Sequence, residues 1–205
     1  MKPFGVDTPH GEARVHLEPA ADARAAVVLG HGAGGGVAAP DLVAAAAAAV
    51  AEGVSVALVE QPYRVAGRRS PAPAHQLDTA WTAVVEHLRA GELASLPLIT
   101  GGRSAGARVA CRTADATGAA GVLCLAFPLL PPRRAKGKPP ESRLPELEAV
   151  TVPVLIVQGD RDPFGMPPPG KKREVVTVAG NHALKSDLDA TGAAVADWLR
   201  RSWLP

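Results

Sequence analysis

The sequence predicts an α/β protein whose mainly parallel central sheet is covered by helices on both faces. Two observations lead to this class. Short aliphatic and β-branched runs alternate along the chain with longer alanine-rich or amphipathic segments, which is typical of strands joined by crossover helices. The strand-like runs are mostly apolar rather than alternately polar, as expected for strands buried on both faces of a sheet.

The expected elements follow one another in a regular order. Strands are predicted at residues 25–29, 54–59, 96–100, 122–127, 154–157 and 174–178, where short apolar runs end in glycine or polar residues. Helices are predicted at 40–52, 75–90, 105–116, 144–149 and 186–201. Pro40 suits the first turn of a helix, and segments 75–90 and 186–201 carry apolar residues at intervals of three and four.

Length and composition are those of one ordinary globular domain. The chain has 205 residues, of which 47% are hydrophobic and 20% charged, so we expect a single domain over residues 1–205. Residues 128–143 are rich in proline and basic side chains, but this stretch is too short to separate two cores. No internal repeat is visible.

Charge and targeting features argue against nucleic-acid and membrane partners. The net charge is only +2 and aromatic residues make up 3%, whereas nucleic-acid recognition favours a broad basic face with aromatics. Residues 1–14 are polar and interrupted by proline and glycine, unlike a secretory signal, and the longest apolar run, 42–51, is too short to span a bilayer. Cys111 and Cys124 are expected as buried free thiols. We therefore expect a cytoplasmic protein.

The most informative stretch is the pattern Gly-x-Ser-x-Gly at residues 102–106, between a strand-like run and an alanine-rich helical segment. This is the sequence form of a nucleophile elbow, in which the serine hydroxyl is exposed on a tight strand-to-helix turn. Gly102 and Gly106 remove side chains that would collide around the strained serine. Ser104 is the candidate nucleophile.

A serine nucleophile needs a base, and the base needs an orienting acid. Catalytic side chains are expected directly after strands, because ligands bind at the carboxyl ends of the strands of a parallel sheet. Asp160 and Asp162 follow the strand-like run 154–157, and His182 follows 174–178. His182 is the candidate base and Asp162 the candidate acid, but spacing alone leaves Asp160 as an alternative.

The chain also offers candidate donors for an oxyanion. A glycine-rich turn at residues 30–36 follows the first buried strand. In folds with a nucleophile elbow, such a turn supplies one backbone N–H and the residue after the nucleophile supplies another. These would be the N–H groups of Ala33 and Ala105.

The same turn matches Gly-x-Gly-x-x-Gly, and Glu60 ends the next strand where a ribose-binding acid would stand. A dinucleotide site would require a helix that opens within the glycines, whereas Pro40 places the helix start later. That alternative also leaves Ser104, Asp162 and His182 without a role.

With these motifs the chain resembles the α/β-hydrolase superfamily, and within it the small dienelactone-hydrolase-like group that includes testis-expressed and chromatin-complex relatives. The resemblance runs from about residue 25 to 198 and rests on residues 30–35, 101–106, 159–165 and 181–182. It implies a three-layer α/β-hydrolase fold with no cap domain. In that family the acid is the fourth residue of Gly-x-x-Asp, which favours Asp162.

Two departures from that family matter. Dienelactone hydrolases use cysteine where Ser104 stands, so their substrate is not carried over. The segment 164–174 is rich in proline where the fold often has a helix. We expect an open site with a rim from residues 61–64 and 128–131, where Tyr63 and Leu129 would either contact substrate or pack. Arg103 would be exposed beside the nucleophile or paired behind it.

These features predict a serine hydrolase that cleaves small or medium carboxylic esters or thioesters through an acyl-enzyme. No cofactor or metal is predicted, and the expected partner is the small-molecule substrate, with the chain a monomer or homodimer. The alternative is a hydrolase-fold interaction protein with slow or vestigial activity.

Overall fold

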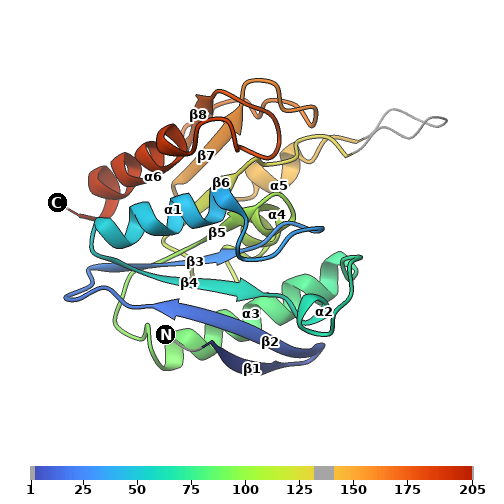
Figure 1. The fold of residues 1–205 in the computed structure, drawn as a ribbon, viewed down its shortest axis with the longest axis vertical. Coiled ribbons are helices and arrows are strands. Elements are labelled where there is room, and N and C mark those ends of the chain that lie inside the picture. Colours follow the sequence, from blue (N-terminus) through green and yellow to red (C-terminus); the bar gives the residue numbers. More distant parts are fainter. Residues whose placement is uncertain (1–2, 132–140, 205) are drawn as a thin grey trace.

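The computed structural model describes residues 3–131 and 141–204. Eight strands form one sheet in the order β1-β2-β4-β3-β5-β6-β7-β8 (Figure 1). The strands are β1 (Phe4–Thr8), β2 (Gly11–Glu18), β3 (Ala25–Gly30), β4 (Val54–Glu60), β5 (Leu98–Arg103), β6 (Gly121–Leu125), β7 (Val154–Gly159) and β8 (Arg173–Val178). In the part of the sheet that runs from β4 through β3 to β8, each strand is parallel to its neighbours. This confirms the predicted mainly parallel sheet.

Helices cover both faces of this sheet, which confirms the three-layer prediction. They are α1 (Pro40–Ala51), α2 (Pro62–Val65), α3 (Ala74–Ala90), α4 (Ala105–Thr113), α5 (Leu144–Glu148) and α6 (Leu188–Trp203). Helices α1 and α6 pack against each other on one face, and α3, α4 and α5 lie on the other (Figure 1). The proline-rich residues 163–172, between β7 and β8, form no helix. The helix that the fold often has at this point is therefore missing, in keeping with the proline content of the segment.

The sequence analysis missed the hairpin of β1 and β2, which extends the sheet at one edge. Strand β2 pairs antiparallel with both β1 and β4. Its alternating pattern buries Ala13, Val15 and Leu17 against α3 and neighbouring strands. A period of two in an otherwise polar segment is the signal that could have revealed this strand.

The strands and their helices bury apolar side chains in separate clusters on the two faces. One cluster joins β3, β5 and β7 to α1 and α6, and two others lie under α3 and under α4 with α5. Strands β3, β6 and β7 are buried along their whole length. This rigid parallel core fixes where the loops at the carboxyl ends of the strands emerge.

Candidate active site

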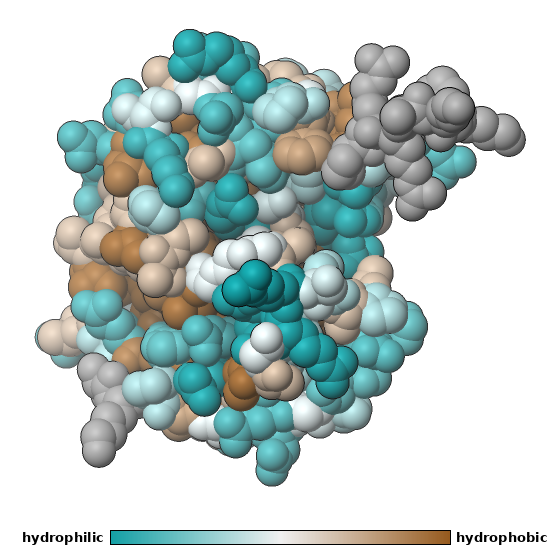
Figure 2. All heavy atoms as spheres, turned by 45° about the vertical axis from the view of Figure 1, so that its right-hand side comes forward, coloured by the Kyte–Doolittle hydropathy of each residue, from teal (hydrophilic) through white to brown (hydrophobic). Residues whose placement is uncertain are grey.

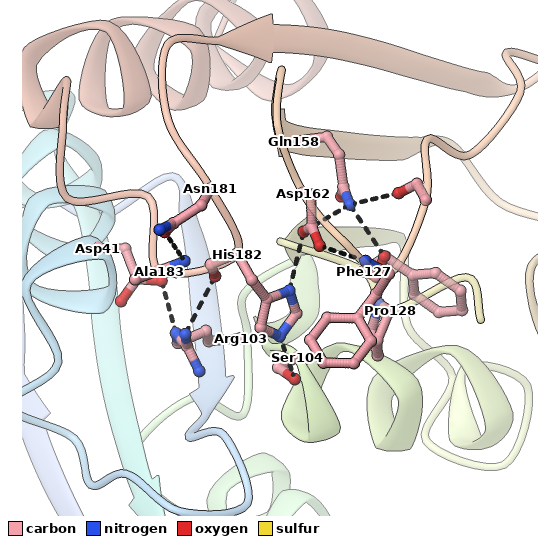
Figure 3. Close-up of polar contacts among 12 residues, drawn as sticks. Asp41, Arg103, Ser104, Phe127, Pro128, Gln158, Asp162, Asn181, His182 and Ala183 are labelled. Carbon is pink, nitrogen blue, oxygen red and sulfur yellow. Dashed lines mark hydrogen bonds and ion pairs between the residues drawn. The ribbon is translucent and has the colours of Figure 1, made fainter. Parts of the chain in front are cut away.

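Three loops at the carboxyl ends of β5, β7 and β8 bring the predicted serine, aspartate and histidine together. The His182 Nε2 and Ser104 Oγ atoms are 2.9 Å apart, and the His182 Nδ1 and Asp162 Oδ2 atoms are 2.8 Å apart (Figure 3). The Asp162 side chain is fully buried, and 17% of the His182 side chain is exposed. The three side chains therefore form one continuous hydrogen-bonded chain that ends at an accessible imidazole and hydroxyl.

Ser104 stands in a strained backbone conformation between β5 and α4. Its φ is 51° and its ψ is −104°, a region that residues with a side chain seldom occupy. Its N–H donates to the Leu125 carbonyl oxygen at 2.9 Å, which ties the turn to β6. Strain of this kind persists only where the surroundings enforce it.

The glycines beside Ser104 are required mainly by contact with β3. A Cβ on Gly102 or Gly106 would collide with the Gly30 carbonyl oxygen, and one on Gly102 would also lie 2.9 Å from the Gly106 carbonyl carbon. The sequence argument placed these collisions around the serine and between the two flanking positions. The contact between position 102 and Gly106 agrees with that argument, and the structure adds that β3 approaches too closely for a side chain at either glycine.

The structure separates the two candidate acids. Asp162 accepts hydrogen bonds from the Phe164 N–H at 2.9 Å and the Gln158 Nε2 at 2.9 Å, in addition to its contact with His182. Asp160 is 48% exposed and accepts from the Gly180 N–H at 2.8 Å. Only Asp162 is placed to orient the imidazole.

Gln158 is a site residue that the sequence analysis missed. Its buried Nε2 donates to Asp162 and lies 3.1 Å from the Phe127 carbonyl oxygen and 2.9 Å from that of Gly165 (Figure 3). It thus joins the Asp162 carboxylate to the loops after β6 and β7. The available signal was a polar residue at the end of an otherwise apolar strand, four positions before the acid.

Arg103 is paired behind Ser104 rather than exposed beside it. Its Nε donates to the Asp41 Oδ2 at 2.9 Å, and its Nη2 donates to the His182 backbone carbonyl at 3.0 Å (Figure 3). Burial raises the pKa of Asp41, and the nearby Arg103 charge opposes that rise. Arg103 thereby links α1 to the loop that carries His182.

The glycine-rich turn after β3 lies beside the serine and is held from behind by two buried rings. The Tyr63 hydroxyl donates to the Ala33 carbonyl oxygen at 2.9 Å. His31 contacts the Gly32 carbonyl oxygen through Nδ1 at 2.8 Å and accepts the Gln61 N–H through Nε2 at 3.1 Å. Burial is the main cause that lowers the pKa of His31.

Ala33 and Ala105 line the same cavity as Ser104. Within residues 3–131 and 141–204, neither backbone N–H donates a hydrogen bond to a protein acceptor.

Helix α1 begins at Pro40, several residues after the glycine-rich turn at residues 30–36. This arrangement departs from the dinucleotide-binding alternative, in which the helix N-terminus stands within the turn.

The cavity at Ser104 has a volume of about 360 Å³ and a mixed lining. Its apolar lining includes Ala33, Pro71, Ala72, Ala74, Leu77, Pro128 and Phe164. The Phe164 ring meets the His182 imidazole edge-on with centroids 4.4 Å apart. The polar side is formed by Arg108, Arg112 and Arg143.

Three side chains expected near substrate do not line this cavity. Tyr63 is buried with its hydroxyl on Ala33, and it lines a separate pocket at the β1–β2 hairpin. Leu129 packs against the apolar cluster under α4 and α5. Arg103 is held by Asp41. In the structure all three side chains therefore pack in the protein or hold its backbone instead of lining the cavity.

Other site types find no support in the described chain. Among residues 3–131 and 141–204, no three His, Cys, Asp or Glu side chains are grouped as a metal ion requires. Within the same residues, no helix combines the length and hydrophobicity needed to cross a bilayer. The buried Cys111 and Cys124 are free thiols, as expected, with their sulfur atoms 3.6 Å apart.

The fold, together with Ser104, Asp162 and His182 on loops after β5, β7 and β8, is that of the α/β-hydrolase class. The family model for the alpha/beta hydrolase domain matches residues 23–188, and the chain belongs to this family. A search of curated proteins found no significant sequence match.

Solved structures of the same fold are similar along nearly the whole chain. An α/β serine hydrolase without lid from Xanthomonas campestris has a TM-score of 0.77 at 21% identity, covering 100% of this chain and 95% of its own. Est1E from Butyrivibrio proteoclasticus has a TM-score of 0.79 at 16% identity, covering 98% and 99%. Dienelactone hydrolase from Anabaena variabilis has a TM-score of 0.76 at 15% identity, covering 98% and 97%. At these identities the likeness concerns the fold.

Proposed function

We propose that this α/β hydrolase is a serine esterase or thioesterase that cleaves carboxylic esters or thioesters of small to medium size. Ser104 is the nucleophile, His182 the general base and acid, and Asp162 the group that orients the imidazole. The observation that carries the proposal is the hydrogen-bonded chain from the Ser104 Oγ through His182 to the buried Asp162 carboxylate.

Each of these contacts suits a step of acyl transfer. With Nδ1 donating to Asp162, the His182 Nε2 is free to accept the Ser104 proton as the oxygen attacks the carbonyl carbon. The imidazolium then gives that proton to the leaving alcohol or thiol, which leaves an acyl-enzyme. A water molecule, deprotonated by His182, attacks the acyl carbon, and Ser104 regains its proton as the acid is released.

Negative charge on the carbonyl oxygen requires donors that are in place before the reaction. The Ala33 and Ala105 N–H groups lie at the same cavity as Ser104 and have no other acceptor in the described chain. Ala105 is also the first residue of α4, where the helix dipole favours negative charge. One such donor typically contributes about 10²–10³ in rate.

The first test is labelling by a fluorophosphonate probe together with hydrolysis of short p-nitrophenyl esters. We expect Ser104→Ala to abolish labelling and to lower kcat by at least about 10³-fold, because the nucleophile is lost. Ser95→Ala, which changes an exposed serine outside the cavity, is the matched control and should behave like the parent protein. Equal labelling of Ser104→Ala and the parent would overturn the assignment. Absence of Ser104-dependent turnover across oxygen esters and thioesters would favour the interaction-protein alternative.

A further inference from the structure

Three guanidinium groups, those of Arg108, Arg112 and Arg143, line the cavity at Ser104. Arg108 and Arg112 follow Ser104 by four and eight positions in the chain, so they lie about one and two turns further along the same face of α4. Arg143 stands just before α5 and lines the same cavity. Three cations this close together repel one another, so the cluster is stabilised by nearby negative charge.

The protein compensates two of these three charges. Arg112 makes a bidentate pair with Asp78, with distances of 2.8 and 2.6 Å. Arg108 makes a bidentate pair with Glu146, with distances of 2.9 and 2.5 Å. Both carboxylates therefore have both oxygens engaged, and the cluster holds three cations against two anions.

Among the described residues, Arg143 is the one of these three cations that has no carboxylate partner. Its Nη1 donates to the Pro128 carbonyl oxygen at 3.0 Å, and within the described chain it forms no ion pair. Residues 132–140, which lie outside the described chain, contain no Asp or Glu. A guanidinium has five N–H donors, so a single carbonyl contact leaves most of its hydrogen-bonding capacity unused.

The electrostatic surroundings of Arg143 lead to the same conclusion. Partial burial lowers its pKa, the charges of Arg108 and Arg112 lower it further, and Glu146 opposes this only in part. An anion bound here would therefore relieve repulsion that the protein itself leaves uncompensated. Figure 2 brings the right-hand side of Figure 1 forward and shows hydrophilic side chains over much of that face, with a larger hydrophobic area at its left.

We propose that the substrate is an ester or thioester that carries an anionic group, a carboxylate or a phosphate, and that Arg143 binds this group. A planar guanidinium matches the oxygens of either anion with two parallel hydrogen bonds. The neutral part of the substrate would lie against Leu77, Pro128 and Phe164, which line the same cavity. This inference rests on the proposed esterase function and adds the class of substrate.

The test compares charged and neutral esters of matched size. p-Nitrophenyl hydrogen glutarate is paired with methyl p-nitrophenyl glutarate, which places the charge on the acyl side. 4-Carboxyphenyl acetate is paired with its methyl ester, which places the charge on the leaving group. p-Nitrophenyl 4-phosphonobutanoate distinguishes a phosphate-like anion from a carboxylate.

For at least one pair we expect the charged ester to have a kcat/KM about ten-fold or more above its neutral partner, as a charge-assisted bidentate contact implies. Arg143→Gln should bring that ratio close to one, and Arg143→Lys should retain part of it. Arg200→Gln removes an equal charge from an exposed site on α6 and should leave the ratio unchanged. Ratios near one for every pair, with Ser104-dependent hydrolysis of the neutral esters intact, would overturn the anion site and leave the esterase proposal standing.

A binding measurement keeps the inference testable without turnover. Calorimetry on Ser104→Ala should detect monomethyl glutarate or methyl 4-phosphonobutanoate, and the addition of Arg143→Gln should weaken binding of the preferred anion at least about ten-fold. Equal affinities with and without Arg143, or no binding of either anion, would refute the anion site whether or not the protein hydrolyses esters.

Discussion

At the scale of single residues, the site depends on how Asp162 is held. The sequence offers two aspartates two positions apart, and both follow the same strand. The structure buries Asp162 and surrounds it with donors from Gln158, Phe164 and His182. Asp160 faces outward and accepts from the loop backbone at Gly180. A buried carboxylate that accepts from several donors keeps its orientation, as an orienting acid must.

Asp162→Asn tests this assignment. We expect kcat for p-nitrophenyl esters to fall by about 10³–10⁴, since an amide favours the wrong imidazole tautomer and does not stabilise the imidazolium. Steady-state kinetics with p-nitrophenyl butyrate measures the effect.

The matched control is Asp160→Asn, which keeps an acceptor for the Gly180 N–H. We expect its kcat to stay within about five-fold of the parent value, an effect of roughly 1 kcal/mol on the barrier. Comparable losses in the two variants would contradict the choice of Asp162.

At the scale of elements, the junction of β3, β5 and α4 sets the position of Ser104, the proposed nucleophile. Gly102 and Gly106 both lie against the backbone at Gly30. The elbow therefore depends on the close approach of a neighbouring strand as well as on its own turn. The spacing of the motif and the strand at 25–29 are visible in the sequence, whereas the close approach of that strand to the two glycines is not.

Gly106→Ala should destabilise the protein strongly. The added Cβ would meet the Gly30 carbonyl group and lie 3.0 Å from the His31 carbonyl oxygen, and backbone cannot move aside without disturbing the sheet. We expect a loss of at least about 2 kcal/mol in the free energy of unfolding, measured by urea denaturation.

Gly36→Ala is the comparison variant, because a Cβ at this position meets no atom within 4 Å. Its free energy of unfolding should change by less than about 0.5 kcal/mol. If both variants were equally stable, the close approach at Gly30 would not be what restricts position 106.

At the scale of the whole molecule, the parallel sheet brings several loops together at the edge where its strands end. These are the loops after β3, β4, β5, β7 and β8. His31 takes part in this convergence, since it connects the turn after β3 to the Gln61 N–H at the end of β4. Burial lowers its pKa in the folded state. The neutral ring is therefore the form that the fold requires.

This predicts that stability falls on acidification. A group whose pKa is lower in the folded than in the unfolded chain contributes stability above its unfolded value, about 6.5, and loses that contribution as the pH falls below it. We expect the free energy of unfolding to decline between pH 7.5 and 5.5, and to decline less in His31→Gln. His75→Gln, at an exposed position on α3, should leave the pH dependence unchanged. Identical slopes in the parent and His31→Gln would contradict the prediction.

Sequence patterns were sufficient for much of the architecture, because they report local geometry. Buried parallel strands appear as continuous apolar runs, and helices appear as apolar residues at intervals of three and four. The main misses lie where strands are half exposed, as in the β1–β2 hairpin, and at the ends of elements. There the local preference is weak and tertiary pairing decides.

By itself, the sequence determined the fold class, the Gly-x-Ser-x-Gly turn and the order in which serine, acid and histidine occur. Only the tertiary structure placed Asp162 rather than Asp160 against His182, paired Arg103 with Asp41 and put Tyr63 outside the cavity at Ser104. It also left Arg143 without an acidic partner among the described residues. Ser104 and His182 are 78 positions apart and Arg103 and Asp41 are 62 apart. Periodicity reports only neighbours a few residues away, whereas contacts between distant residues depend on how the whole sheet is assembled.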